Sequence, residues 1–277
     1  MGGYPARRAA DVQDYEWVFP AYGIEDLQWI YEDPVVKYEL ERLLGPTRAK
    51  ADSNAIRITT HPGPYPNLCS PNDAVVARAI TDFEYHAYFA ELMGYGDTWH
   101  SSGYAINIHA NHNQDPDLLR FRSNVGKLSQ TARNLITLEN DEFGCNIDEI
   151  IASGIGDEVA LLLDIHHHWI ESQGEYILPD DPRIEQYAAS WRDIRPVGHL
   201  STSREDLLVG ECDKTRPDFS ALFGRGFKAT KLRAHSDLCW NAAVNEWAIS
   251  HLTWMDIEVE AKFKNLASQQ LYDRAQG

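Results

Sequence analysis

The chain has 277 residues, with 25 Lys and Arg against 42 Asp and Glu, a formal net charge of −17 and 43% hydrophobic residues. This apolar content suffices for a full core, so the composition excludes the disordered and fibrous classes. No apolar run approaches the roughly 20 residues of a membrane helix, and the first ten residues lack the apolar stretch of a signal peptide, so we expect a cytoplasmic protein without membrane contact. The acidic excess counts against generic nucleic-acid binding, which depends on clustered Lys and Arg.

Short apolar runs alternate with longer helical patterns from about residue 55 onward. This alternation is typical of helices packed outside a parallel sheet. The apolar runs predict strands at residues 56–60, 105–109, 135–139, 159–164, 196–200 and 257–260. Upstream of them, residues 3–5 and 26–31 are two further candidate strands, and residues 35–44 are a candidate helix.

Apolar residues at helical spacing predict helices at residues 72–93, 238–250 and 261–276. The first of these follows Ser70-Pro71-Asn72 and stops at Gly94. Six strands and two further candidates make eight, so we predict an α/β fold, a single TIM (β/α)₈ barrel domain over residues 1–277, with a shortened or divergent N-terminal part. A doubly wound open sheet of six strands is the alternative.

Each of the six predicted strands ends in, or is followed by, a side chain that can bind a divalent metal ion. These side chains are His61, His109, Glu139, Asp164, His199 and Glu260. Because the carboxyl ends of barrel strands meet at one mouth, we expect these side chains to converge there. Imidazole and carboxylate ligands without a convincing Cys ligand favour Mn²⁺, Zn²⁺ or Fe²⁺, and so large a set predicts two or three ions.

Further histidines lie off these strand ends. In His166-His167-His168, alternation along the strand would turn His166 inward, whereas a turn would bring His167 back to the metal, so spacing alone leaves the choice open. His86 lies within the helix predicted at residues 72–93, and His235 lies outside the predicted strands.

The order of motifs along the chain is distinctive. Its strongest part is Leu138-Glu139-Asn140-Asp141 followed by Asp164-Ile165-His166-His167-His168. Other stretches in this order are His61-Pro62-Gly63, Glu84-Tyr85-His86, Ile106-Asn107-Ile108-His109, His199-Leu200-Ser201, His235-Ser236-Asp237 and Glu260-Ala261-Lys262. From residue 56 to about residue 267, this order resembles the UV-damage endonuclease (UvdE-like) family, within the xylose-isomerase-like TIM barrel superfamily.

The resemblance implies a TIM barrel that holds up to three divalent ions, usually manganese, and that cuts DNA directly 5′ to a UV lesion or similar damage. Zinc, iron and cobalt are alternatives for the metal. Carried over position by position, the resemblance implies the metal ligands His61, His86, His109, Glu139, Asp164, His167, His199, His235 and Glu260. It thereby selects the middle one of the three adjacent histidines. The implied reaction is phosphodiester hydrolysis by a metal-activated water, without a protein nucleophile.

Candidate catalytic and DNA-binding residues complete the prediction. The resemblance makes Lys262 a candidate phosphate contact and His235 a second candidate catalytic residue. Two tyrosines are candidate contacts to damaged double-stranded DNA: Tyr4, in the segment that resembles the family's first strand, and Tyr88, as an aromatic wedge between bases. Three further candidates, Arg225, Lys228 and Lys231, lie in the basic segment 224–233 between the predicted seventh and eighth strands. No obligate protein partner is predicted.

Two features depart from the family pattern. Val197 stands where the family has a metal-bridging lysine, so the number of ions is open. The stretch Ala87-Tyr88-Phe89-Ala90 stands where the family inserts a polar and an aromatic residue into the duplex, which leaves Tyr88 or Phe89 as the wedge. In addition, the net charge of −17 leaves little surplus for a basic groove. An alternative is therefore a relative with the same metal cluster that acts on a small molecule or nucleotide, as a sugar isomerase or epimerase or an iron-dependent oxygenase. A third hypothesis is a catalytically inactive barrel that binds a protein. A continuous positive surface at the mouth favours the endonuclease, and a closed, narrow mouth without a positive rim favours the small molecule.

Overall fold

The computed structural model describes residues 32–63, 66–110, 115, 117–205, 207–208 and 212–276. Its contacts divide the chain into two compact units, Met1–Leu138 and Glu139–Gly277, called unit 1 and unit 2 below. Tyr4 and the candidate strands at residues 3–5 and 26–31 lie outside the described residues. The single domain predicted over residues 1–277 stays a prediction.

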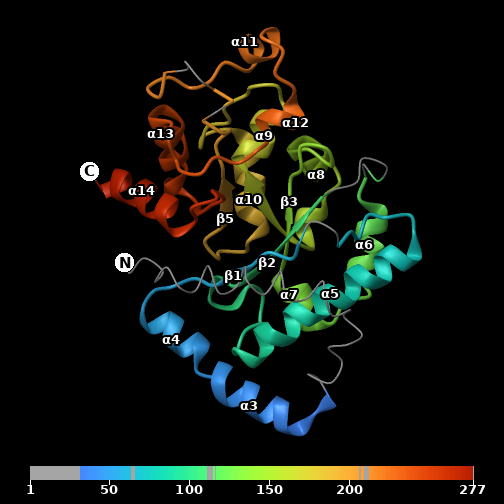
Figure 1. Cartoon of the computed structure of the whole chain (residues 1–277). Helices are drawn as coiled ribbons and strands as arrows, with labels where there is room; N and C mark the ends of the chain where they lie inside the picture. The colour runs from blue at the N-terminus through green and yellow to red at the C-terminus, as the bar shows by residue number, and fades with distance from the viewer. Residues whose placement is uncertain are drawn as a thin grey trace. The chain divides into compact units, whose positions relative to one another are not determined.

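Unit 1 contains a parallel pair of strands and the longest described helix, α5 (Figure 1). Its elements are α3 (Pro34–Leu44), α4 (Thr47–Ser53), β1 (Thr59–Thr60), α5 (Asp73–Leu92), η3 (Ser101–Gly103), β2 (Ala105–His109), α6 (Leu119–Val125), α7 (Gln130–Leu135) and most of β3 (Ile136–Glu139). Thr60 of β1 lies opposite Ile106 of β2. The Asn72 side chain accepts the N–H of Ala74 and so caps α5, which buries Phe83 and smaller apolar side chains and packs against α7.

Unit 2 is built around three parallel strands. Its elements are α8 (Ile147–Ala152), η4 (Ile155–Asp157), β4 (Ala160–Asp164), α9 (Ile165–Glu171), α10 (Pro182–Ser190), β5 (Val197–Leu200), α11 (Phe219–Gly224), α12 (Ala229–Leu232), α13 (Ala242–Ser250), η5 (His251–Thr253), β6 (Asp256–Val259) and α14 (Asn265–Gln276). Asp164 at the end of β4 lies opposite His199 of β5, which lies opposite Glu258 of β6. Strand β4 is buried along its whole length, and α10 packs against it.

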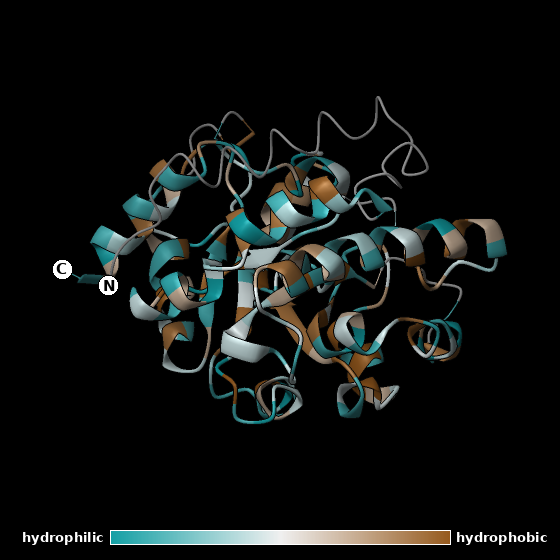
Figure 2. Ribbon diagram, turned by 90° about the horizontal axis from the view of Figure 1, so that it is seen from below, coloured by the Kyte–Doolittle hydropathy of each residue, from teal (hydrophilic) through white to brown (hydrophobic). Residues whose placement is uncertain are grey.

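Polar and apolar residues are mixed along many of the helices, as the colours of Figure 2 show. In α10, for example, Ile184 and Tyr187 are buried while Glu185 is exposed, the spacing expected when one stripe of a helix faces the core. Within the described residues, no helix combines the length and the apolar character that crossing a membrane requires.

Each of the six strands predicted from residue 56 onward is present, with small shifts at the ends. Strand β1 is shorter than predicted because the N–H of Ile56 still bonds to the Ala51 carbonyl at the end of α4. Helices α13 and α14 begin four residues later than predicted, at Ala242 and Asn265. Before α14, the N–H of Lys262 bonds to a loop carbonyl at Ser236 instead of entering a helix.

The order of the strands bears on the choice between barrel and open sheet. Within each unit, strands that are consecutive in the chain are parallel neighbours. A (β/α)₈ barrel repeats this order, whereas a doubly wound sheet reverses it at one point. The described residues therefore form an α/β fold with six strands, and the closed barrel of eight strands stays a prediction.

Candidate metal centre

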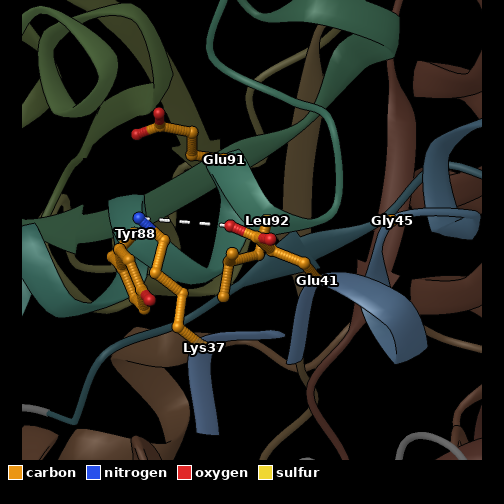
Figure 3. A pocket seen from close by; sticks show the side chains of 6 residues that line it. All are labelled: Lys37, Glu41, Gly45, Tyr88, Glu91 and Leu92. Carbon is orange, nitrogen blue, oxygen red and sulfur yellow. Dashed lines mark ion pairs between the residues drawn. The ribbon is translucent and has the colours of Figure 1, made fainter. Parts of the chain in front are cut away.

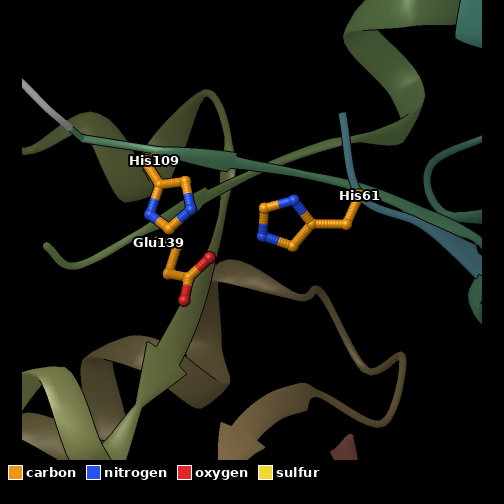
Figure 4. Close-up of side chains that lie close together, drawn as sticks. All are labelled: His61, His109 and Glu139. Carbon is orange, nitrogen blue, oxygen red and sulfur yellow. The ribbon is translucent and has the colours of Figure 1, made fainter. Parts of the chain in front are cut away.

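Two predicted ligands face each other in unit 1. His61 follows β1 directly and His109 is the last residue of β2, so the parallel pairing of these strands brings both side chains to the same end. Their ring centroids lie 5.0 Å apart, with the ring planes tilted by 55°. Figure 4 shows the two imidazole rings next to each other. The Nδ1 of His61 lies 2.7 Å from the Pro62 carbonyl oxygen. When Nδ1 donates its proton there, the metal-binding lone pair lies on Nε2.

The third predicted ligand of unit 1, His86, lies on α5 with its side chain 23% exposed. Burial, with a smaller contribution from His61, lowers the pKa of His86 to about 4. The imidazole is therefore neutral near pH 7, which is the form that binds metal ions. The electrostatic effect of His61 on His86 means that the two predicted ligands share one neighbourhood of unit 1.

Tyr88 points away from this neighbourhood. It follows His86 by two residues, about 200° around the helix. Its side chain lines a hollow of about 310 Å³ between α3 and α5, together with Lys37 and Glu41 (Figure 3). The structure therefore does not bring Tyr88 together with His86, and the aromatic wedge between DNA bases stays a prediction.

In unit 2, predicted ligands gather at the ends of the strands. Glu139 ends β3, Asp164 ends β4, and His199 lies in β5. All three side chains are buried, and one ligand atom from each lies within 4.8 Å of the others. Parallel strands end at the same edge of a sheet, which is why residues that are far apart in the sequence meet here.

Asp164 uses its two carboxylate oxygens differently. Its Oδ1 caps helix α9 by accepting the backbone N–H groups of His166, at 2.6 Å, and His167, at 2.7 Å. Its Oδ2 is buried and has no hydrogen-bond partner among the described residues, and the Nδ1 of His167 lies 3.8 Å away. A buried carboxylate oxygen without a hydrogen bond is costly unless a cation pairs with it. This oxygen therefore fits a metal ligand.

The structure separates the three adjacent histidines. His166 Nε2 lies 3.3 Å from the Leu232 carbonyl oxygen, and His168 Nε2 lies 3.1 Å from Glu175. His167 is the one that faces the strand-end acids, with its Nδ1 3.4 Å from Glu139 Oε1. The start of α9 explains this difference. Asp164 caps the helix, and His167, three residues later, lies on the same side of the helix as Asp164.

Two carboxylates that the sequence analysis did not select also lie in this group. Glu142 Oε2 is 3.4 Å from His167 Nε2, and the Glu142 side chain is 5% exposed. Glu258 Oε2 is 3.1 Å from His199 Nε2. Glu258 could have been found from the strand period, because it precedes Glu260 by two residues and so shares its face of β6. Glu142 follows the strand end by three residues in a loop, and no periodic signal marks it.

These acids create a negative potential around the two imidazoles. Burial by itself would lower the pKa of His167, but Asp164 and the surrounding glutamates raise it to about 10. The pKa of His199 is likewise raised well above its usual value, mainly by Glu139 and Glu260 against the effect of burial. Burial and the neighbouring acids raise the pKa of Asp164 to about 7, against the opposing effect of His167. Positive charge is therefore stabilised at this place, as a divalent cation requires.

His235 and Glu260 lie at the margin of the group. His235 Nε2 is 3.9 Å from Glu260 Oε2, with the side chains 33% and 24% exposed. Glu260 Oε1 is also 3.4 Å from His199 Nδ1. Lys262 lies further out, where its Nζ donates to Asp237 Oδ1 over 3.1 Å in an exposed ion pair. The catalytic roles of Lys262 and His235 stay predictions.

The basic segment 224–233 lies next to helix α9 of unit 2, which contains the three adjacent histidines. Helix α12 contacts α9, and the side chains of Arg225, Lys228 and Lys231 are exposed. Arg233, two residues after Lys231, pairs with Glu142 over 3.1 Å. The segment therefore connects an exposed basic surface with the buried acids, although the DNA contacts themselves stay predictions.

The donor set of unit 2 fits a divalent metal ion. Carboxylates and imidazoles without a thiolate suit Mn²⁺, Zn²⁺ and Fe²⁺. The residues that could hold an ion there are Glu139, Asp164, His167, His199 and Glu260, with His235 at the margin.

Known proteins resemble this chain over most of its length. The UV DNA damage endonuclease of Bacillus mycoides is 25% identical over 252 residues, which are 86% of this chain and 69% of that protein. The UV-damage endonuclease of Schizosaccharomyces pombe is 28% identical over 225 residues, 79% of this chain and 33% of that protein. The UV-damage endonuclease of Neurospora crassa is 30% identical over 172 residues, 57% of this chain and 26% of that protein. The matches thus span a third or less of the two fungal proteins.

A solved structure shows the same fold. The crystal structure of SacUVDE superimposes with a TM-score of 0.65 and 23% sequence identity, covering 86% of this chain and 71% of the other. The family of UV-endonuclease UvdE matches residues 32–277, which include every described strand and helix from α3 to α14. The chain belongs to the UV-endonuclease UvdE family.

Proposed function

We propose that this chain is a metal-dependent endonuclease of DNA repair that hydrolyses the phosphodiester bond on the 5′ side of a UV lesion or similar damage. The observation that carries the proposal is the buried group of Glu139, Asp164 and His199 in a chain of the UvdE family. A cytoplasmic location stays a prediction.

The proposed ligands in unit 2 are Glu139, Asp164, His167, His199, His235 and Glu260, and those in unit 1 are His61, His86 and His109. Bound divalent ions, Mn²⁺ first and Zn²⁺, Fe²⁺ or Co²⁺ as alternatives, would neutralise charge on the phosphate and lower the pKa of a water molecule near neutral pH. Val197 is buried and offers no ligand atom where the resemblance expects a lysine, so two ions are as compatible with this chain as three.

The proposed DNA contacts are electrostatic. Arg225, Lys228, Lys231 and Arg233 are exposed on the segment beside α9, and cations of this kind bind the phosphate backbone. Lys262 is proposed as a further phosphate contact, which requires its exposed pair with Asp237 to open. An exposed ion pair contributes little stability, so this rearrangement has a small cost.

A second candidate function is the isomerisation, epimerisation or iron-dependent oxygenation of a small molecule or nucleotide at the same metal site. The net charge of −17 and the buried Val197 favour it. It requires no extended basic surface, and it keeps the roles proposed for the buried acids and histidines.

An end-labelled duplex with one UV photoproduct tests the choice, with Mn²⁺ present and an undamaged duplex alongside. We expect a nick directly 5′ to the lesion with the wild type and none with Asp164→Asn. Asn caps a helix as well as Asp does, so this variant removes the charged ligand and keeps α9. Asp157→Asn, an exposed change of the same chemistry, should cleave like the wild type. A wild type that binds Mn²⁺ but leaves both duplexes intact at low and high salt would exclude the endonuclease and favour the small molecule.

A further inference from the structure

His199 lies between carboxylates at both of its ring nitrogens. Its Nδ1 is 2.9 Å from Glu139 Oε1 and 3.4 Å from Glu260 Oε1. Its Nε2 is 3.1 Å from Glu258 Oε2. The His199 side chain is 1% exposed and that of Glu258 is 31% exposed, so Glu258 reaches the buried ring from the more open side.

The strand register makes this arrangement. In the parallel pairing of β5 with β6, His199 lies directly opposite Glu258. Glu258 and Glu260 are two residues apart and therefore project from the same face of the chain. Glu258 therefore contacts Nε2 of the ring, and Glu260 lies beside Nδ1. A single carboxylate could not reach both nitrogens.

The two nitrogens of a neutral imidazole have different roles. The nitrogen that binds a cation must offer a lone pair, and the other then carries the proton and needs an acceptor. Asp164 joins Glu139 beside His199, with one ligand atom from each within 4.8 Å, and Glu260 lies beside Nδ1. Glu139 and Glu260 are therefore both at Nδ1, whereas Glu258 contacts Nε2.

We propose that Glu258 is a positioning residue that accepts the Nε2–H of His199 and thereby leaves the Nδ1 lone pair free for the cation that Glu139, Asp164 and Glu260 would bind. The inference rests on the proposed function, because it takes His199 as a ligand. Carboxylate partners of this kind fix the tautomer and the orientation of metal-binding histidines, and their loss typically weakens metal binding by about 10- to 100-fold.

Mn²⁺ affinity of the full chain, measured by titration, tests the proposal with two substitutions. Glu258→Ala removes the acceptor, and we expect a loss of about 10-fold or more. Glu258→Gln keeps an amide oxygen in reach of Nε2–H, and we expect it to restore most of the affinity. Asp256→Asn removes the same charge from the same strand, where Asp256 pairs with Arg195, and should leave the affinity within about 2-fold of the wild type. Circular dichroism checks that each variant is folded.

A spectroscopic measurement identifies directly which ring nitrogen of His199 binds the metal ion. In the Zn²⁺-loaded protein, ¹⁵N spectra of His199, assigned by comparison with His199→Gln, should show the proton on Nε2 and the metal on Nδ1. A proton on Nδ1, or equal affinity of Glu258→Ala and the wild type, would overturn the role of Glu258 alone. A wild type that binds neither Mn²⁺ nor Zn²⁺ would overturn the proposed function with it.

Discussion

The Asn140 side chain and the Asp164 backbone exchange two hydrogen bonds. The Asp164 N–H donates to Asn140 Oδ1 over 2.9 Å, and Asn140 Nδ2 donates to the Asp164 carbonyl oxygen over 3.0 Å. Both residues are buried. A side-chain amide thus takes the place of a neighbouring strand at the end of β4, and it fixes the backbone from which the Asp164 carboxylate projects.

We expect Asn140→Ala to lower the free energy of unfolding by about 2 kcal/mol, because two buried backbone groups lose their partners. The same change should weaken Mn²⁺ binding by loosening Asp164. Urea unfolding and a Mn²⁺ titration measure the two effects. Asn54→Ala, at an exposed helix end, should cost no more than about 0.5 kcal/mol and leave Mn²⁺ binding unchanged. Equal losses from the two variants would contradict the role of Asn140.

Gly198, next to His199, is held by close neighbours. A Cβ at this position would collide with the Met255 sulfur and come within 2.7 Å of the Leu163 carbonyl oxygen. We expect Gly198→Ala to destabilise the fold by about 2 kcal/mol, because β4 or the Met255 side chain must shift. Gly224→Ala meets no atom within 4 Å and is the matched control. Thermal unfolding of both variants checks the difference, and a stable Gly198→Ala would show that β5 has room to move.

The basic segment should contribute to DNA affinity in proportion to its charge. We expect the double variant Lys228→Ala/Lys231→Ala to bind duplex DNA more weakly, with the slope of log affinity against log salt smaller by about 2. Its Mn²⁺ affinity should not change. The control Lys37→Ala/Arg42→Ala also removes two charges, but each of these cations pairs with a glutamate on α3, so we expect a smaller change in slope. Identical slopes for the two variants would argue against a DNA-binding role for the segment.

Acid should destabilise unit 2 through His251. Its Nε2 lies 3.1 Å from the Ile177 carbonyl oxygen, and its Nδ1 accepts the indole N–H of Trp254 over 3.0 Å, so only the neutral ring satisfies both contacts. Burial is the largest cause that lowers the pKa of His251 from 6.5 to about 4. The unfolded chain therefore binds this proton more readily than the folded chain. The contribution of His251 to stability is complete above pH 6.5 and is lost as the pH falls toward 4.

Urea midpoints at several pH values test this linkage. The lowered pKa of His251 corresponds to a contribution of at most about 3 kcal/mol to the free energy of unfolding. Other groups titrate in the same range, so the quantity to compare is the difference between the wild type and His251→Gln. We expect the wild type to lose stability faster than the variant between pH 6.5 and 4. Parallel curves would mean that His251 is accessible to protons in the folded state.

Much of the unit 2 site could be predicted because short stretches of sequence identify its residues. An apolar run of a few residues identifies a buried strand, and the polar residue that ends the run must lie at the strand's edge. Glu139, Asp164 and His199 satisfied this rule, and the structure brings them together. The choice of His167 depended on the family resemblance, because the strand period alone cannot say where a helix begins.

The remaining features depend on contacts between distant residues. The ion pair of Lys262 with Asp237 joins two loops, and the bond of His199 to Glu258 depends on the register of two strands. Neither follows from spacing within one segment. The position of Tyr88 differs, because a helical period of about 100° per residue already separates it from His86.

The capping bond of Asp164 couples the folding of α9 to the occupancy of the site. A helix of seven residues is too short to persist by itself in water, so its first turn depends on the cap and on packing. Opening that turn releases Asp164 and His167 together, and a bound cation therefore opposes the opening. Hydrogen exchange at the amides of His166 and His167 should slow on addition of Mn²⁺. Exchange in α14, the helix that follows β6 in the sequence, should not change. Local order in α9 would then report ligand binding without any substrate present.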